Sequence, residues 1–311
     1  MDLLQILLGV ALLYAGGEGL VRGASALGRT LGLTPMVIGL TVVSFGTSSP
    51  ELAASLVGVL QGAPAVSFGN IVGSNIANLG LVLGATAAIW PLAVAARFLK
   101  REMPVLTVIS ASMFWLVRDG TVDRLEGLVL LVVLAIYLRI LFRKPAEPEV
   151  VTEEFEREYG GGKISVAWSV LLVLGGIGLL VLGANSLVQG AVGIARSLGV
   201  SERVIGLTIV AFGTSLPELA ACVVAAMRRE GDIVLGNLIG SNVFNILFIL
   251  GLISLVHPLS VDTQAVRLDL AVMLALTFVV WGLLTTGKRL VRWEGVVLFV
   301  GYGVYVASLF L

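Results

Sequence analysis

Residues 37–51 read VIGLTVVSFGTSSPE, and residues 204–218 read VIGLTIVAFGTSLPE, with 12 of 15 positions identical. The same register, 167 residues between equivalent positions, relates GNIVGSNIAN at 69–78 to GNLIGSNVFN at 236–245. Two copies in one register without a gap indicate an internal duplication. Each copy carries one glutamate, Glu51 or Glu218, in apolar sequence. An ionisable residue in such surroundings is a candidate functional residue.

The composition excludes a soluble globular protein. Hydrophobic residues make up 58% of the chain and charged residues 13%, and the mean hydropathy is +1.03. Apolar stretches near the ~20 residues that span a bilayer predict transmembrane helices. We expect ten, at 3–22, 34–60, 67–90, 104–117, 124–142, 165–187, 202–227, 233–256, 266–286 and 292–311. The expected fold class is an all-α polytopic membrane protein.

The ten expected helices divide into five per copy. Because five is an odd number, the second copy enters the membrane from the opposite side, which predicts two inverted-topology five-helix repeats. The expected domains are a first repeat at 1–142, a cytoplasmic linker at 143–163 and a second repeat at 164–311. The linker is rich in charge, Pro and Gly, and it is too short for a regulatory domain. A solvated loop is its simplest interpretation, and a calcium-sensing segment is the alternative.

Loop charges predict the orientation. If the N-terminus lies outside, 15 of the 20 Lys and Arg residues fall on the cytoplasmic side, as the positive-inside rule requires. Both termini are then extracytoplasmic in a multi-pass protein of the cell membrane. The N-terminus has no basic segment before its apolar run, so we expect no cleavable signal.

Prolines interrupt the second and seventh expected helices. Pro50 and Pro217 lack an N–H, so the carbonyls of Gly46 and Gly213, four residues earlier, lose their helical donors. Irregular backbone is tolerated at membrane depth only where it is buried in protein or lines a wet cavity, and its free carbonyls can bind a cation there. We therefore expect helices 2 and 7 to be broken and to supply ligands.

Side-chain oxygens surround both breaks. Residues three and four apart share a helix face, which groups Thr47 and Ser48 with Glu51, and Thr214 and Ser215 with Glu218. A polar stripe follows in the next helix of each copy, at Asn70, Ser74 and Asn78 and at Asn237, Ser241 and Asn245. Carboxylates, hydroxyls, amides and carbonyls are ligands for hard cations such as Ca²⁺ and Na⁺.

The Ser and Asn stripe has a second interpretation, since such residues often join membrane helices by packing and hydrogen bonds without any ligand. The spacing does not decide between the two. The two glutamates are less easily explained by packing, because all 20 Lys and Arg residues are assigned to loops or helix ends. A mobile cation is the natural partner for these carboxylates.

The motifs GTSSPEL and GTSLPEL, each followed by GN-x-x-GSN-x-x-N, resemble the two alpha repeats of the cation/Ca²⁺ exchanger superfamily. The resemblance is closest to its prokaryotic Na⁺/Ca²⁺ exchangers, and with the ten-helix layout it covers nearly the whole chain. It implies an electrogenic antiporter that exchanges Na⁺ for Ca²⁺ by alternating access, with three Na⁺ per Ca²⁺. The ions are then substrates, and no prosthetic group, nucleic acid or obligatory protein partner is implied.

The resemblance also implies roles for individual residues. Glu51 and Glu218 would coordinate Ca²⁺ at the centre. Flanking Na⁺ sites would use the hydroxyls of Thr47, Ser48, Ser74, Thr214, Ser215 and Ser241 and the carbonyls of Ser44 and Ala211. Asn78 and Asn245 match the remaining polar positions near the centre. The glycine-rich helices 1 and 6 would slide across the core.

One position departs from much of the superfamily, which often has Asp where this chain has Asn245. The central site then holds two carboxylates, which argues against K⁺ co-transport. A proton-coupled Ca²⁺/cation antiporter is the main alternative, since the glutamates could carry protons. A channel would use the same oxygens without exchange. An enzyme is not expected, because no His, Asp or Lys lies near the Ser and Thr residues to activate them.

Overall fold

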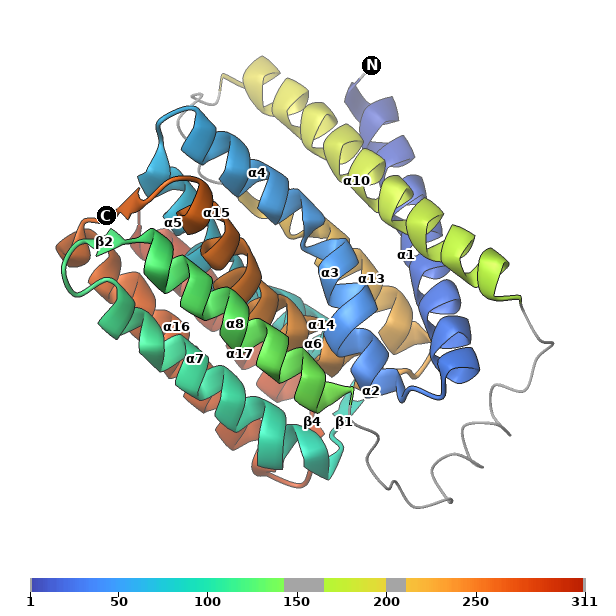
Figure 1. Ribbon diagram of the computed structural model, residues 1–311. Helices are drawn as coiled ribbons and strands as arrows, with labels where there is room; N and C mark the ends of the chain where they lie inside the picture. The colour runs from blue at the N-terminus through green and yellow to red at the C-terminus, as the bar shows by residue number, and fades with distance from the viewer. Residues whose placement is uncertain (1, 143–164, 200–210, 310–311) are drawn as a thin grey trace.

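The computed structural model describes residues 2–142, 165–199 and 211–309, and these residues form a bundle of helices with two very short strand pairs (Figure 1). The helices of the first copy are α1 (Asp2–Leu31), α2 (Pro35–Ile38), η1 (Gly39–Val43), α3 (Ser44–Thr47), α4 (Ser49–Leu60), α5 (Pro64–Ala77), η2 (Asn78–Val82), α6 (Leu83–Ile89), η3 (Phe98–Glu102), α7 (Met103–Leu116) and α8 (Arg124–Leu141). Those of the second are α10 (Val166–Ser197), α12 (Ala211–Thr214), α13 (Leu216–Met227), α14 (Gly231–Phe244), η5 (Asn245–Leu250), α15 (Gly251–Val256), α16 (Thr263–Thr285) and α17 (Arg292–Ser308). The η segments are π-helical turns.

Most helix positions agree with the expected stretches, but two predicted ends are wrong. The first helix was expected to end at residue 22 and the sixth at 187, whereas α1 continues to Leu31 and α10 to Ser197. A prediction based on hydropathy ends a helix where polar residues such as Arg22 appear. The backbone remains helical beyond that point in both helices. The expected linker at 143–163 and residues 202–210 of the seventh helix lie outside the described residues.

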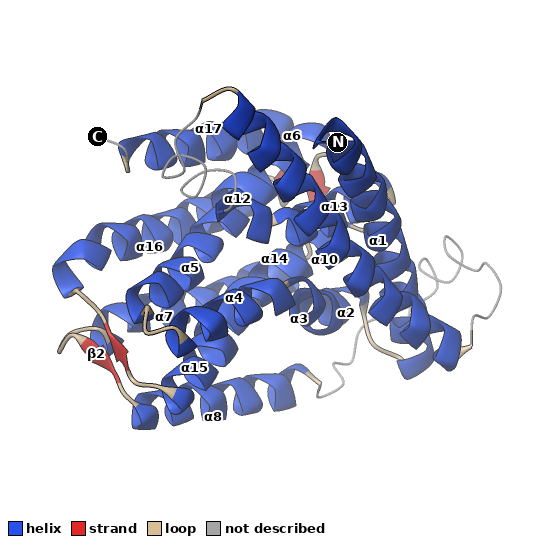
Figure 2. Ribbon diagram, turned by 90° about the horizontal axis from the view of Figure 1, so that it is seen from above, coloured by secondary structure: helices blue, strands red, loops and turns tan. Residues whose placement is uncertain are grey.

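Two helix runs, α5–η2–α6 and α14–η5–α15, form the interior of the bundle. In their membrane-length stretches 83% and 78% of the residues are buried, against 33% in α1 and 28% in both α10 and α16. These are the five helices, within the described residues, that are long and apolar enough to cross a membrane. Figure 2 shows α14 near the middle of the bundle, with α1 on one side and α16 on the other.

Helices α1 and α10 run side by side along one flank (Figure 1). Their contact follows a seven-residue repeat of glycines on α1. Gly9 faces Gly183 and Gly16 faces Gly176, while Gly23 packs against Ser169 and Val173 of α10. A Cβ added at Gly16 or Gly176 would lie 2.7 Å or 2.5 Å from a backbone nitrogen of the partner helix. Small residues allow membrane helices to pack with their backbones in contact. The two helices therefore form one tightly packed unit, which we call the peripheral pair.

The strands relate the two copies. β1 (Leu92–Ala93) pairs antiparallel with β4 (Arg289–Leu290), and β2 (Thr121–Val122) pairs antiparallel with β3 (Leu259–Ser260). Leu92 and Leu259 occupy equivalent positions in the duplicated sequence. Each copy thus pairs the strand after its third helix with the strand before the last helix of the other copy. The two copies are intertwined rather than side by side.

Candidate functional site

The second and seventh expected helices are interrupted beside Pro50 and Pro217, where the sequence predicts a break. The helical run from Pro35 to Thr47 stops at Ser48, whose backbone has φ −81° and ψ 4°, and α4 begins at the next residue. In the second copy Ser215 has φ −89° and ψ 3° between α12 and α13. Proline near the first position of α4 and α13 is favoured there, because that position needs no N–H donor.

Glu51 and Glu218 lie in the first turns of α4 and α13, directly after these breaks. Each is 1% exposed. The N-terminal end of a helix favours a negative charge. The two carboxylates lie close enough to interact electrostatically. Within the described residues, Oε2 of each has no hydrogen-bond partner, which is costly for a buried carboxylate unless a cation completes it.

Three hydrogen bonds between side chains join the two copies around this centre. They run from Ser48 Oγ to Glu218 Oε1 (3.2 Å), from Thr47 Oγ1 to Asn237 Oδ1 (3.1 Å) and from Asn78 Nδ2 to Asn242 Oδ1 (3.0 Å). The breaks and stripes of both copies therefore build one shared polar centre.

Further buried polar atoms have no partner among the described residues. They include Asn78 Oδ1, Ser241 Oγ and both side-chain atoms of Asn245, Oδ1 and Nδ2, and also Asn75 Oδ1, Thr86 Oγ1 and Ser254 Oγ. Buried polar side-chain atoms in proteins nearly always have a partner, so a group of unpartnered ones calls for a ligand or an ion. The oxygens in this group, with those of the two carboxylates, have the chemistry that suits Ca²⁺ or Na⁺.

The backbone is irregular beside these residues. The π-helical turn η2 begins at Asn78 and η5 begins at Asn245, the equivalent position of the other copy. Short π-helical turns inside α-helices are frequent at functional sites. Both turns place their asparagines where a regular helix changes its pitch.

The other candidate residues lie on the same elements. Ser44, Ser74 and Ser215 are buried, and Thr214 is half-buried at the end of α12. Ser44 is already engaged, because its hydroxyl donates to the Gly39 carbonyl (2.7 Å) and its own carbonyl accepts the Ser48 N–H (2.9 Å). Ala211 begins α12. The cross-copy contacts thus bring Ser48, Thr47 and Asn78 to the centre, whereas the ligand roles of the serines on α5 and α14 rest on burial and position.

The asparagine of each GN pair, Asn70 or Asn237, forms hydrogen bonds to the helix that carries the glutamate of its own copy, α4 or α13. Asn70 Nδ2 donates to Ser55 Oγ (3.0 Å) and to the Glu51 carbonyl (3.3 Å). Asn237 Nδ2 donates to Cys222 Sγ (3.3 Å). Ser55 and Cys222 are equivalent positions of the duplication. The repeat register is the sequence signal that identifies them as a pair.

A small recess opens beside Ser48. It is lined by Phe45, Ser49 and Leu52 on the first copy and by Phe244 and Phe248 on the second. The three phenylalanine rings pack with centroids 5.7–6.2 Å apart. Aromatic side chains thus line the recess beside Ser48.

Comparison with known proteins agrees with this architecture. The family model described as "Sodium/calcium exchanger protein" matches residues 1–143 and 168–311. The chain is 40% identical to the putative antiporter CaxA of Alkalimonas amylolytica, covering 96% of both chains. It is 33% identical to the sodium/calcium exchanger MaX1 of Methanosarcina acetivorans, covering 100% of this chain and 99% of that one.

Solved structures of the sodium-calcium exchanger NCX_Mj are similar over the whole fold. The one soaked without Na⁺ and Ca²⁺ has a TM-score of 0.85 at 34% identity, over 99% of this chain and 98% of that chain. The family match covers both copies and leaves out only the region between them. The chain therefore belongs to the sodium/calcium exchanger protein family.

Proposed function

We propose that this chain is an antiporter that exchanges Na⁺ for Ca²⁺ at one central site shared by its two copies. The observation that carries the proposal is the pair of buried carboxylates, Glu51 and Glu218, each with an unpartnered oxygen among the described residues. Two carboxylates together balance the charge of one Ca²⁺. Relatives named as a sodium/calcium exchanger and as a putative antiporter support the same assignment.

The proposed ligands follow from the geometry and the family. Glu51 and Glu218 would hold Ca²⁺, and the buried, unpartnered amide oxygens of Asn78 and Asn245 are the further proposed ligands. Na⁺ takes neutral oxygens as well as the carboxylates. Its proposed ligands are the hydroxyls of Thr47, Ser48, Ser74, Thr214, Ser215 and Ser241 and the carbonyls of Ser44 and Ala211.

Competition for the two carboxylates provides the coupling. When Ca²⁺ occupies them, Na⁺ cannot use them, so the site carries one kind of ion at a time. An empty site would leave two buried charges without partners, which makes movement without an ion unfavourable. Three Na⁺ exchanged for one Ca²⁺ would move one net charge in each cycle, so we propose that transport is electrogenic.

The proposed topology is ten transmembrane helices in two inverted five-helix repeats, at 1–142 and 164–311, joined by a cytoplasmic linker at 143–163. The strand pairs that exchange partners between copies support a two-fold relation. Fifteen of the 20 Lys and Arg residues on one side support extracytoplasmic termini. Alternating access then arises from movement of parts of the repeats about a fixed central site.

The test is Ca²⁺ uptake by purified protein in liposomes. Vesicles loaded with Na⁺ and diluted into Na⁺-free medium should accumulate radioactive Ca²⁺. Because three Na⁺ leaving for each Ca²⁺ entering would carry one net positive charge out of the vesicle, an inside-positive potential should speed this uptake and an inside-negative potential should slow it. Uptake that ignores Na⁺ and follows an imposed pH gradient would instead assign the proton-coupled alternative.

A further inference from the structure

The peripheral pair is attached to the rest of the bundle mainly through α1 and α13. A Cβ added at Gly17 of α1 would lie 3.0 Å from Val224 Cγ2 and 3.2 Å from the Ala220 carbonyl oxygen, both on α13. The stretches of α1 and α10 that could span a membrane are only 33% and 28% buried. The pair is therefore a unit packed closely within itself and covered by the bundle on one side. It is the part of the fold best suited to move as a body.

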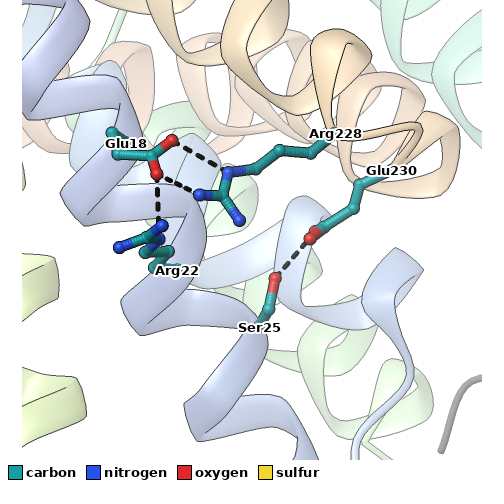
Figure 3. A network of polar contacts seen from close by, with 5 residues as sticks. All are labelled: Glu18, Arg22, Ser25, Arg228 and Glu230. Atoms are coloured by element: carbon teal, nitrogen blue, oxygen red, sulfur yellow. Dashed lines mark hydrogen bonds and ion pairs between the residues drawn. The ribbon is translucent and has the colours of Figure 1, made fainter. Parts of the chain in front are cut away.

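Two polar contacts connect the C-terminal half of α1 to the turn that joins α13 to α14 (Figure 3). Glu18 Oε2 accepts a hydrogen bond from Arg228 Nε (2.8 Å), and its other oxygen forms an ion pair with the same guanidinium. About two helical turns further along α1, Ser25 Oγ donates to Glu230 Oε2 (2.7 Å). Both contacts cross from the peripheral pair to the second copy.

Both contacts are sheltered from solvent. Ser25 is 5% exposed and Glu230 is 6% exposed, and the side chains of Glu18 and Arg228 are 24% and 28% exposed. Burial raises the pKa of the Glu230 carboxyl, and the Ser25 hydroxyl and Arg228 oppose that shift. Separating α1 from this turn would leave buried polar groups without partners, which costs free energy.

The equivalent positions of the other copy lack these polar and charged groups. The positions equivalent to Glu18, Ser25, Arg228 and Glu230 are Asn185, Val192, Gln61 and Ala63. None of the four has an ionisable side chain. In inverted repeats the two access states correspond to exchanged arrangements of the two copies. An attachment present in only one copy therefore favours one state over the other.

We propose that Glu18–Arg228 and Ser25–Glu230 form a latch that holds the peripheral pair against the second copy and favours the state closed to the cytoplasm. The proposal rests on the proposed function for the existence of two access states, and on the proposed orientation for the side. By that orientation, which puts the Lys- and Arg-rich side in the cytoplasm, the latch lies in the cytoplasmic half of α1 and at the cytoplasmic end of α13. The pair must release it before ions can reach the centre from that side.

The test compares the two faces of the membrane. Exchange is measured in inside-out and right-side-out vesicles, each giving the half-saturating Ca²⁺ concentration at one face. In Glu18→Gln, Arg228→Gln and Ser25→Ala we expect the ratio of the cytoplasmic value to the outer value to fall roughly two- to fivefold, the range for a partly exposed ion pair. The double variant Glu18→Gln with Arg228→Gln should shift the ratio no further than either single variant, because both remove one interaction.

Arg22→Gln is the matched control. Arg22 Nε pairs with Glu18 Oε1 (2.8 Å) within α1 itself, so its loss removes charge without releasing α1 from α13. We expect an unchanged ratio. An unchanged ratio in the latch variants, or a shift of both faces in the same direction, would overturn the latch. The second pattern would indicate altered ion binding.

A second readout does not depend on transport. Val224→Cys, in a Cys222→Ser background, places a thiol on α13 where it faces Gly17. The latch variants should speed its labelling by a membrane-impermeant reagent from the cytoplasmic side, and Arg22→Gln should not. Equal labelling rates in all of these proteins would overturn the latch. The two proposals can fail separately. Faster labelling in the latch variants than in Arg22→Gln, together with no Na⁺-driven Ca²⁺ uptake by the unchanged protein, would support the latch and refute the proposed transport function.

Discussion

The hydroxyl of Ser48, at the helix break of the first copy, donates a hydrogen bond of 3.2 Å to the carboxylate of Glu218 in the second copy. The break of one copy is thus joined to the acidic residue of the other. Both glutamates are buried, and this contact links the two copies beside them. In the proposed function they belong to one site to which both copies contribute. Changes to either copy should therefore affect the same ion.

Replacement of either central carboxylate should abolish Ca²⁺ transport. Glu51→Gln and Glu218→Gln each remove half of the negative charge that balances Ca²⁺. The ion-free proteins should be at least as stable as the unchanged protein, since a neutral amide costs less to bury than a carboxylate. Ca²⁺ flux and melting temperature, with and without Ca²⁺, test both statements.

The matched control is Glu126→Gln. Glu126 is the third residue of α8, where it completes a capping box with Asp123, and glutamine can replace glutamate in that motif. We expect this variant to transport Ca²⁺ and to gain stability from Ca²⁺ as the unchanged protein does. Ca²⁺ flux retained by Glu51→Gln or Glu218→Gln would refute the assigned site.

A third carboxylate should make exchange sensitive to protons or K⁺. In Asn245→Asp, the new acid lies where both side-chain polar atoms of Asn245 are buried and unpartnered among the described residues. Protonation at low pH would relieve the added charge and a monovalent cation would compensate it. The pH profile and K⁺ dependence of exchange should both change, and two unchanged profiles would contradict the two-carboxylate site.

Cys222 should matter as a hydrogen-bond acceptor and not as a thiol. Its Sγ accepts from Asn237, whose Oδ1 in turn accepts from Thr47. Cys222→Ser restores the residue found at the equivalent Ser55 and should leave stability nearly unchanged. Cys222→Val leaves the Asn237 amide group unpaired and should cost roughly 1–3 kcal/mol of unfolding free energy. Denaturation in detergent compares them, and equal stabilities would exclude this role.

The glycine seam should resist even one added methyl group. Gly16→Ala or Gly176→Ala places a Cβ 2.7 Å or 2.5 Å from a backbone nitrogen of the facing helix, and overpacking of this kind costs about 1–3 kcal/mol. Gly175→Ala is the control, because no atom lies within 4 Å of its Cβ position. Thermal unfolding in detergent should show lower stability only for the seam variants.

The duplicated motifs and their prolines predicted the two helix breaks, whereas hydropathy alone placed two helix ends wrongly. The breaks at Ser48 and Ser215 follow from proline, which acts through its own residue and its near neighbours. Polar residues in the extension of α1 to Leu31 have partners in the folded chain, since Arg22 pairs with Glu18 on α1 and Ser25 bonds to Glu230 after α13. An apolar window cannot detect a polar helical turn that is stabilised in this way.

The sequence identified the candidate site residues, whose role as ion ligands stays a prediction, but it did not indicate the contacts between them. Glu51 and Glu218 could be found because each repeats in an apolar setting. The bond between Asn78 and Asn242 joins positions of two copies that are not equivalent, so neither spacing nor repeat register indicates it. The latch between Glu18 and Arg228 also depends on which helices become neighbours. Pairings of this kind arise only from the folded arrangement.

The most direct test of the central claim, that Na⁺ and Ca²⁺ compete for one two-carboxylate site, is equilibrium Ca²⁺ binding to the purified protein at increasing Na⁺ and constant ionic strength. We expect one Ca²⁺ per chain, and a half-saturating Ca²⁺ concentration that rises more steeply than in proportion to Na⁺, because several Na⁺ replace each Ca²⁺. Ca²⁺ binding that is indifferent to Na⁺ would contradict a shared site and the exchange mechanism built on it.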